Sequence, residues 1–298
     1  MVERDIGVFC STIIPTINRA TLSRAVCSVL NQAFTAADFE VIVVNDSGQP
    51  LPDMDWQHSA RVRVLNTNHR ERSVARNTGA AISRGKYLHF MDDDDWLLPG
   101  AWEEFWALSK SNAAVWLYAG CRAVDNNGNT IREVQPDLSG NIFAQLVAGE
   151  GIAHVSSLFS SDAFFQTGLF TPYGTEEIRD LGRRIALWGD VAGSTKIVGC
   201  IRIGQEGSTT DWSKLSETDR WGREIALREY RAFARLEASA KTAYWHGRVS
   251  RAYLASTVWN LKRKQIFTAA SRASAALAFA SRHALSPDFW DGIRTKVT

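Results

Sequence analysis

The sequence predicts an α/β fold in which a mostly parallel sheet is flanked by helices, followed by a C-terminal helical extension. Three observations predict it: β-branched runs alternate with amphipathic segments, polar clusters follow several of the runs, and the last part of the chain has helical periodicity. Strands that alternate with helices form parallel sheets covered on both faces. The chain has 298 residues, 45% of them hydrophobic, so it can bury a large core.

The regular alternation lies in the N-terminal part of the chain. Residues 8–14 and 39–44 are β-branched runs of strand length, and residues 20–34 between them have their apolar side chains at helical spacing. The alternation continues with a strand at 61–65, a helix at 72–85 and a strand at 86–91.

A less regular region follows. It predicts a strand at 113–124, a tight turn at Asn127-Gly128, a strand at 130–134, a helix at 142–147, a strand at 155–159 and a helix at 176–187.

The C-terminal region differs from the rest in charge. Residues 217–298 contain 15 Lys and Arg against 7 Asp and Glu, a balance of +8, whereas residues 1–216 contain 19 against 25, a balance of −6. Helical spacing predicts helices at 221–236, with Phe233 on the apolar face, and at 242–261 and 265–282. We therefore expect two structural units, 1–215 and 216–298.

Composition and motifs exclude several classes of protein. The four cysteines are far apart and the six histidines have no zinc-site spacing, so we interpret them, His154 and His246 included, as structural. Neither a G-x-G-x-x-G nor a G-K-[ST] phosphate loop occurs, which argues against dinucleotide dehydrogenases and P-loop enzymes. No leader or membrane-spanning segment is apparent, and we expect a soluble, cytoplasmic protein without a nucleic-acid partner.

Polar clusters follow three of the predicted strands, at residues 15–19, 45–48 and 92–95. The carboxyl ends of parallel strands share one edge of a sheet, so these clusters should converge there. The last cluster is four consecutive aspartates, whose like charges repel. A solvated turn is one interpretation; the other is an Mg²⁺ or Mn²⁺ site, because these ions prefer carboxylate oxygens and complete their coordination with substrate phosphates.

Neighbouring residues favour a phosphate-bearing ligand. Asp46 can accept hydrogen bonds from a base or ribose, although an Asx turn is equally consistent. Arg70, Arg72 and Arg76 open the helix before the aspartates, where they can meet phosphates or form ordinary ion pairs.

Four segments together resemble glycosyltransferase family 2, in the order typical of that family and over residues 8–192. They are STIIPTINR, EVIVVNDSG, SVARNTGAAISRGKYLHFMDDDDW and FQTGLFTPYGTEEIRDLGRRIALWGDVA. The resemblance implies a GT-A fold, a nucleotide-sugar donor, for which we expect a UDP-sugar, Mn²⁺ or Mg²⁺ bound through a D-x-D motif, and inversion at the anomeric carbon. It also implies that residues 1–130 bind the donor and residues 131–215 bind the acceptor and carry the base.

The resemblance assigns roles to individual residues. The nucleotide-binding loops of the family correspond to Pro15, Thr16, Ile17, Asn18 and Asp46, its A-R-N segment contains Arg76, and its D-x-D corresponds to Asp92, Asp93 and Asp94. Asp92 and Asp93 would face the donor, and Asp94, together with Asp92, would bind the metal. Asp95 is open: it either supports the ligands or ends a solvated turn.

The catalytic base corresponds to Glu177, with Glu176 as its partner, although either could be the base and a simple acid at a helix start is the alternative. Two departures from the family stand out. Ile17 lies where many relatives have Tyr, and Gln205 or Glu206 lies where relatives often have His, which bears on the third metal contact.

The resemblance implies transfer of a sugar to a hydroxyl group on a glycan, a lipid-linked acceptor or a polysaccharide precursor. A metal would neutralise the departing diphosphate, and a carboxylate would take the acceptor proton. Two alternatives remain: a nucleotide-sugar and metal-binding protein without transfer, and an aspartate phosphatase, whose D-x-D usually follows the first strand.

For the basic extension we favour a packed helical cap. A lid, a contact in an oligomer, or a patch on the anionic inner face of the membrane are the alternatives.

Overall fold

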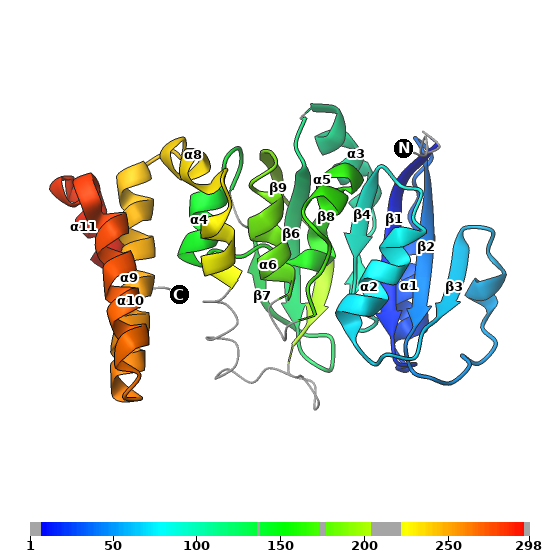
Figure 1. The fold of residues 1–298 in the computed structure, drawn as a ribbon. Helices are drawn as coiled ribbons and strands as arrows, with labels where there is room; N and C mark the ends of the chain where they lie inside the picture. The colour runs from blue at the N-terminus through cyan, green and yellow to red at the C-terminus, as the bar shows by residue number, and fades with distance from the viewer. Residues whose placement is uncertain (1–6, 112, 136–137, 173–176, 204–221, 295–298) are drawn as a thin grey trace. The chain divides into compact units, whose positions relative to one another are not determined.

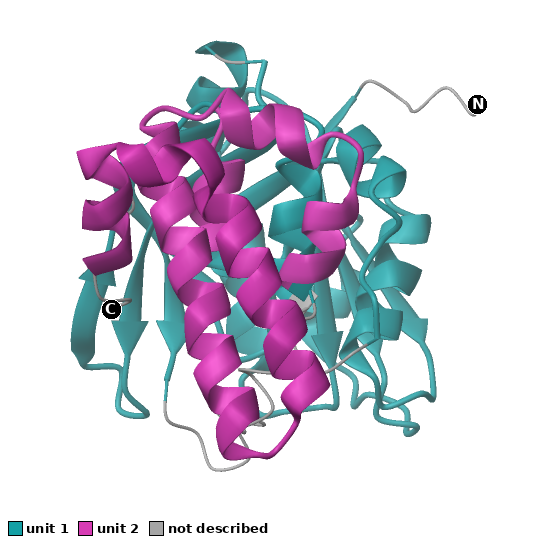
Figure 2. Cartoon of the chain, turned by 60° about the vertical axis from the view of Figure 1, so that its left-hand side comes forward, with its two compact units in different colours: residues 1–140, 152–222 teal, residues 141–151, 223–298 magenta. Residues whose placement is uncertain are grey.

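The computed structural model describes residues 7–111, 113–135, 138–172, 177–203 and 222–294. The chain divides into two compact units, coloured separately in Figure 2. Unit 1 comprises residues 1–140 and 152–222, and unit 2 comprises residues 141–151 and 223–298. Residues 141–151 thus belong with the C-terminal helices, whereas the sequence-based division at residue 215 groups them with the first part of the chain.

Unit 1 contains a nine-stranded mixed sheet with the strand order β3-β2-β1-β4-β8-β6-β9-β5, and β7 pairs with β6 (Figure 1). In chain order the strands are β1 (Val8–Thr16), β2 (Asp38–Asn45), β3 (Val62–Asn66), β4 (Tyr87–Phe90), β5 (Trp96–Leu97), β6 (Trp116–Val124), β7 (Thr130–Val134), β8 (Ser157–Ser160) and β9 (Val191–Arg202). The helices of this unit are α1 (Leu22–Leu30), α2 (Arg72–Ala81), α3 (Ala101–Ser111), α5 (Ser161–Gln166), α6 (Glu177–Ile185) and the 3₁₀ helices η1 (Asp55–His58) and η2 (His154–Ser156).

The half of the sheet formed by β3, β2, β1 and β4 is entirely parallel. Alternate residues of its strands face opposite layers: Ile14 and Val43 join a core with α1, whereas Ile13 and Val44 face α2. Gly79 allows α2 to approach, since a Cβ atom there would lie 2.6 Å from Ile13 Cγ2. Helices therefore cover both faces, and the predicted α/β class is confirmed.

The other half of the sheet and the helices around it are predicted only in part. The sequence predicts β6, β7 and β8, but not β5, β9, α3 or α5. β9 runs parallel to β6 through Gly193, Ser194 and Lys196, which have no β-strand pattern of their own. Its strand conformation depends on long-range pairing with β6 rather than on local propensity.

Unit 2 is helical. Its elements are α4 (Phe143–Ala148), α8 (Ala232–Glu237), α9 (Thr242–Lys262), α10 (Ile266–Ala280), the 3₁₀ helix η3 (Ser281–Leu285) and α11 (Pro287–Arg294), and residues 223–228 are also helical. The predicted pair at 242–261 and 265–282 agrees closely with α9 and α10. No helix in the described part of the chain combines the length and apolarity that a bilayer crossing requires.

The prediction of a single helix at 221–236 is wrong, because the structure has two helical segments there. The helical segment at residues 222–228 ends in a turn before α8 begins, and the Glu229 and Ala232 amides donate to carbonyls three residues earlier. Such i to i−3 bonds tighten the backbone and change the direction of the side chains. Consequently Phe233 is 71% exposed instead of lying on a buried face.

Candidate functional site

The four aspartates form a turn at the carboxyl end of β4. Phe90 pairs with Ile13 of β1, the Met91 amide donates to the Ile13 carbonyl, and the Asp95 amide donates to the Asp92 carbonyl at 3.2 Å. Asp93 and Asp95 are each 3% exposed, whereas the side chains of Asp92 and Asp94 are 32% and 16% exposed. The run therefore separates into a buried pair and a more accessible pair.

Asp92 is paired with a buried cation from α2. Arg76, which is 1% exposed, donates from Nη2 to Asp92 Oδ1 at 2.6 Å. Burial would raise the pKa of Asp92, but the charges of Arg76 and then His154 outweigh it and hold that pKa well below its usual range. Arg76 thus keeps the Asp92 carboxylate ionised.

Asp93 and Asp94 share a cation from the loop after β1. Arg19 Nη1 lies 3.1 Å from Asp93 Oδ1 and 3.0 Å from Asp94 Oδ2, and the Thr16 hydroxyl donates to Asp93 Oδ2 at 2.5 Å. Burial raises the pKa of both carboxyls, and neighbouring aspartates add to the effect. The ends of β1 and β4 are therefore joined through Asp93.

Asp95 lies on the other side of the turn, near His154 of η2. Its Oδ1 accepts from the Arg202 amide at 3.0 Å, and its Oδ2 lies 3.7 Å from His154 Nε2, which is 3.5 Å from Asp92 Oδ2. Burial and the charges of Asp92 and Asp94 raise the pKa of Asp95 well above its usual value. His154 Nε2 is buried without a hydrogen-bond partner among the described residues.

The loop residues after β1 and β2 divide into buried and exposed groups. Pro15 and Thr16 are buried in β1, whereas Ile17 and Asn18 are exposed, and Asn18 adopts a positive φ of 67° while its amide donates to Thr16 Oγ1. Asp46 directly follows β2, and its amide donates to the Thr16 carbonyl.

The Asp46 carboxylate already organises the neighbouring loop. It accepts from the Thr67 hydroxyl and from the amides of His69 and Glu71 at 2.7–2.8 Å. Burial opposes these bonds, but together they lower the pKa of Asp46. The carboxylate is thus fixed and ionised at the same edge as Thr16.

The segment before α6 is attached to α2, which also carries Arg76. Asn77 donates from Nδ2 to the Phe170 carbonyl at 2.9 Å and accepts from the Phe170 amide at 3.0 Å. The Phe170 ring also packs on Phe90. Helix α6 begins at Glu177, whose side chain lies outside the described part of the structure, as do Glu176, Gln205 and Glu206.

The side chains on this edge fit a hard divalent cation. Ligand atoms of Asp92, Asp95 and His154 lie within 4.8 Å of one another. Three of the four carboxylates pair with the guanidiniums of Arg19 and Arg76, whereas Asp95 accepts from the Arg202 amide. The carboxylate oxygens suit Mn²⁺ or Mg²⁺, and a cation would relieve the repulsion that helps to raise the pKa of Asp95.

Residues 11–163, just over half of the chain, match the sequence profile described as Glycosyl transferase family 2. The chain belongs to this family. The membership predicted from the four sequence segments is therefore confirmed. Enzymes of this family are glycosyltransferases, so the predicted enzyme class is confirmed as well.

Curated relatives match this family 2 chain over limited lengths. The poly(ribitol-phosphate) beta-N-acetylglucosaminyltransferase TarP of Staphylococcus aureus is 34% identical over 41% of this chain and 38% of its own length. An uncharacterized glycosyltransferase of Rickettsia bellii is 28% identical over 67% of this chain and 29% of its own length. The chain thus spans about a third of the length of these relatives.

Solved structures extend the likeness to most of the chain. S. aureus TarS 1–349 in complex with UDP-GlcNAc covers 90% of this chain and 91% of that structure, with a TM-score of 0.63 and 13% identity. At this identity the likeness shows the fold, and it confirms the predicted GT-A class.

For this family 2 chain, the structure brings together most of the predicted site residues. Thr16, Asp46, Arg76 and the aspartate turn converge on one sheet edge through the contacts described above. Sequence reasoning missed Arg19 as a direct partner of the aspartates and placed His154 among structural histidines. Arg19 belongs to the polar cluster at residues 15–19, so its position after β1 was a usable signal. His154 is about 60 residues from the aspartates in sequence, and no local pattern connects it to them.

Proposed function

We propose that this chain transfers a sugar from a UDP-sugar to a hydroxyl group of a glycan, a lipid-linked acceptor or a cell-surface polysaccharide precursor, with inversion at the anomeric carbon. The observation that carries the proposal is the pair of accessible carboxylates, Asp92 and Asp94, held beside Arg76 and Arg19 at the carboxyl end of β4. The names of TarP and of a Campylobacter jejuni GalNAc(5)-diNAcBac-PP-undecaprenol beta-1,3-glucosyltransferase, 29% identical over 41% of this chain, support this class of acceptor. The UDP-GlcNAc bound to TarS supports the donor.

The donor would lie over the loops after β1 and β2. Pro15, Thr16, Ile17 and Asn18 would contact the nucleotide, and Asp46, which already accepts three hydrogen bonds, would orient that loop and contribute its remaining acceptor capacity. Arg76, Asp92 and Asp93 would border the diphosphate.

A bound Mn²⁺ or Mg²⁺ would neutralise negative charge on the departing diphosphate. We propose Asp92 and Asp94 as its ligands, because they are the two more accessible carboxylates of the turn. Asp95 and His154 would support Asp92 from the buried side, and Nε2 of His154, which faces both carboxylates, offers a further nitrogen ligand.

The acceptor hydroxyl would lose its proton to a carboxylate at the start of α6. We propose Glu177 as this base, with Glu176 beside it, in the region 131–215 that would bind the acceptor. The attachment of Phe170 to Asn77 supports the assignment, together with the hydrogen bond from the Thr171 hydroxyl to Asp180 of α6, because the two link α2 to α6. General-base catalysis requires such fixed positioning.

Donor consumption tests this function. Purified protein is incubated with UDP-GlcNAc and Mn²⁺, with and without hydroxyl-bearing glycan acceptors, and UDP release is measured. Asp94→Ala should lower turnover by about 100-fold or more while the fold is retained. Full activity of Asp94→Ala would contradict the proposed role of Asp94 as a metal ligand. If activity is lost in His154→Gln but kept in Asp94→Ala, the metal ligands are instead Asp92, Asp95 and His154.

The alternative is a protein that binds nucleotide-sugar and metal without transfer. The exposed aliphatic Ile17 motivates it, since it offers no aromatic ring for stacking on a base. Under this alternative UDP-GlcNAc raises the melting temperature in the presence of Mn²⁺, but no UDP is released with any acceptor or with water. Any UDP release that depends on Asp94 contradicts it.

We also propose a peripheral contact with the inner face of the membrane through the turn between α9 and α10. Leu261, Ile266 and Phe267 are 53%, 67% and 94% exposed there, and the intervening Lys262, Arg263 and Lys264 are exposed cations. Apolar side chains beside cations suit an anionic lipid surface, where each cation adds about 1 kcal/mol of attraction. A cytoplasmic protein would thereby approach lipid-linked acceptors.

Vesicle sedimentation tests the membrane contact. The protein should sediment at low salt with vesicles that contain phosphatidylglycerol and remain in solution with phosphatidylcholine alone. Phe267→Glu should abolish sedimentation, and Phe233→Glu, at another exposed site of unit 2, should preserve it. Equal loss in both variants, or no sedimentation of the native protein, would overturn the proposal.

A further inference from the structure

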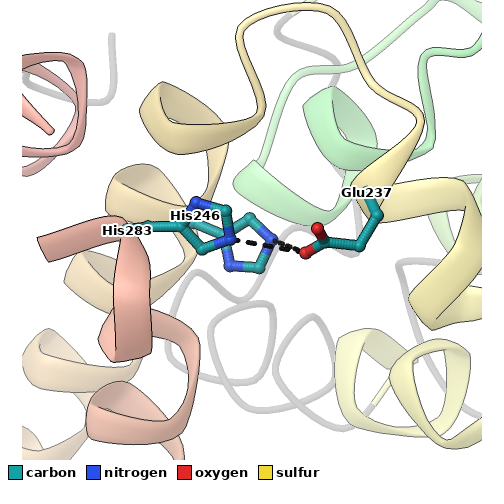
Figure 3. Close-up of side chains that lie close together, drawn as sticks. All are labelled: Glu237, His246 and His283. Carbon is teal, nitrogen blue, oxygen red and sulfur yellow. Dashed lines mark hydrogen bonds and ion pairs between the residues drawn. The ribbon is translucent and has the colours of Figure 1, made fainter.

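Three titratable side chains of unit 2 meet in a cluster that the transfer reaction does not use. Glu237 ends α8, His246 lies near the start of α9, and His283 lies in η3 (Figure 3). The side chains of His246, His283 and Glu237 are 7%, 13% and 24% exposed. The cluster therefore joins three separate segments in a largely buried position.

The hydrogen bond on the far side of the His246 ring fixes its tautomer. Nδ1 lies 2.9 Å from the Phe279 carbonyl, which can only accept, so Nδ1 carries the proton. In the neutral ring Nε2 then bears a lone pair, and it faces Glu237 Oε1 at 3.4 Å. Two electron-rich atoms thus point at each other, and Nε2 is buried without a hydrogen-bond partner among the residues described.

Burial lowers the pKa of His246, and the nearby His283 and Arg282 act in the same direction against the Phe279 hydrogen bond and Glu237. The two imidazole rings are stacked with centroids 3.9 Å apart, so charging both is unfavourable.

The geometry matches a transition-metal site. Glu237 Oε1 lies 3.4 Å from His246 Nε2 and 3.3 Å from His283 Nε2, and the three ligand atoms lie within 4.8 Å of one another. Ligands about 2.0–2.1 Å from a tetrahedral Zn²⁺ lie about 3.3 Å apart. The bond from His246 Nδ1 to a backbone carbonyl is the support that metal-binding imidazoles normally have.

We propose that Glu237, His246 and His283 bind Zn²⁺, with solvent as a fourth ligand, and that the ion clips together α8, α9 and η3. In the metal-free form His283 Nε2 donates to Glu237 Oε1. On metal binding this proton moves through solvent to Nδ1 of the same ring, and the freed Nε2 lone pair faces Zn²⁺. Arg282 pairs with the other oxygen, Oε2, and leaves Oε1 for the ion. The site lies wholly within unit 2, so its role is structural and independent of the proposed transfer.

Zinc retention by the full chain tests the site. The protein is incubated with ZnCl₂, desalted, and its zinc content is measured by mass spectrometry. We expect about one equivalent in the native protein and its loss in His283→Gln, a variant at the edge of the cluster that should still fold. His58→Gln, at an exposed histidine, and His154→Gln, at the aspartate turn, are matched controls that should retain zinc.

Two further measurements use the unmodified protein, so they do not depend on how a variant folds. Zn²⁺ should raise its melting temperature by about 2 °C or more, and Co²⁺ should give the visible absorption of a tetrahedral site. Zinc retained equally by His283→Gln, or lost in His154→Gln instead, would overturn the proposal, as would the absence of both effects in the native protein.

Discussion

The four aspartates of the turn, residues 92–95, have different environments. Asp92 is held ionised by Arg76, Asp93 and Asp94 share Arg19, and Asp95 is buried, with a pKa raised by burial and by its neighbours. The sequence shows four equal charges, and the differences arise only from residues that the fold brings from α2, β1 and η2. The chemical role of each carboxylate is therefore set by its partners.

His89, in the middle of β4, should make stability depend on pH. It is fully buried, its Nε2 donates to the Val155 carbonyl, and burial, with the charge of His154, lowers its pKa to about 4. The folded state therefore rejects a proton that the unfolded chain binds below about pH 6.5, so stability falls as pH drops from 6.5 toward 4. The full effect is about 3 kcal/mol.

Urea unfolding between pH 4 and pH 7 measures this dependence. His89→Gln should flatten the decline, whatever its effect on stability at pH 7, and His58→Gln should leave the slope unchanged. A slope in His89→Gln equal to that of the native protein would show that other groups cause the decline.

At the scale of elements, the attachment of Phe170 and Thr171 to α2 links the region proposed to bind the donor to the segment before α6. Asn77→Ala removes both hydrogen bonds to Phe170 and leaves backbone groups unpaired, which should lower the free energy of unfolding by about 2 kcal/mol. The proposed transfer activity should fall further than stability requires, because the link from α2 to α6 through Phe170, Thr171 and Asp180 is weakened.

Thr78→Ala is the matched control for this prediction, since among the described residues the Thr78 hydroxyl bonds within its own helix, to the Val74 carbonyl. It should change stability by less than about 1 kcal/mol and leave activity intact. Equal losses of activity in the two variants would contradict the positioning role of Asn77.

Glu40 stabilises the opposite end of the parallel strands. It accepts from Ser11, the Arg84 amide and Arg63, and it is 2% exposed. Despite its burial, these partners lower its pKa, so Glu40→Gln should cost about 3 kcal/mol near neutral pH without changing affinity for UDP.

The exposed pair formed by Asp38 and Arg61 supplies the comparison. Asp38→Asn should cost less than about 1 kcal/mol in the same denaturation experiment. A weakened affinity for UDP in Glu40→Gln would show that the two ends of the sheet are coupled.

Sequence reasoning succeeded where local patterns and long-range structure agree. The strands and helices up to β4 follow from hydrophobic period, and the convergence of Thr16, Asp46 and the aspartates follows from parallel strand order. It failed for β9, which depends on pairing with β6, and for His154, which reaches Asp92 only after η2 folds. The roles assigned to Glu176, Glu177, Gln205 and Glu206 stay predictions.

At the scale of the whole molecule, the predicted donor site draws its described contacts from unit 1 alone. Hydrogen exchange with UDP and Mn²⁺ should therefore show added protection near the ends of β1 and β4. Amides in the middle of α9 and α10 should exchange as in the free protein. Equal protection in both regions would mean that donor binding is coupled to unit 2.

The chain enters unit 2 twice, and this order has a consequence for synthesis on the ribosome. Helix α4 buries Phe143, Leu146 and Val147 in unit 2, and Asn141 and Glu150 on either side of it bond Arg235 and Arg248. At about 5–20 residues per second, α9 is complete only about 6–23 s after α4. During that interval the apolar side chains of α4 have no α8 or α9 to pack against. In a shortened chain that ends before α8, they would never be covered by these helices.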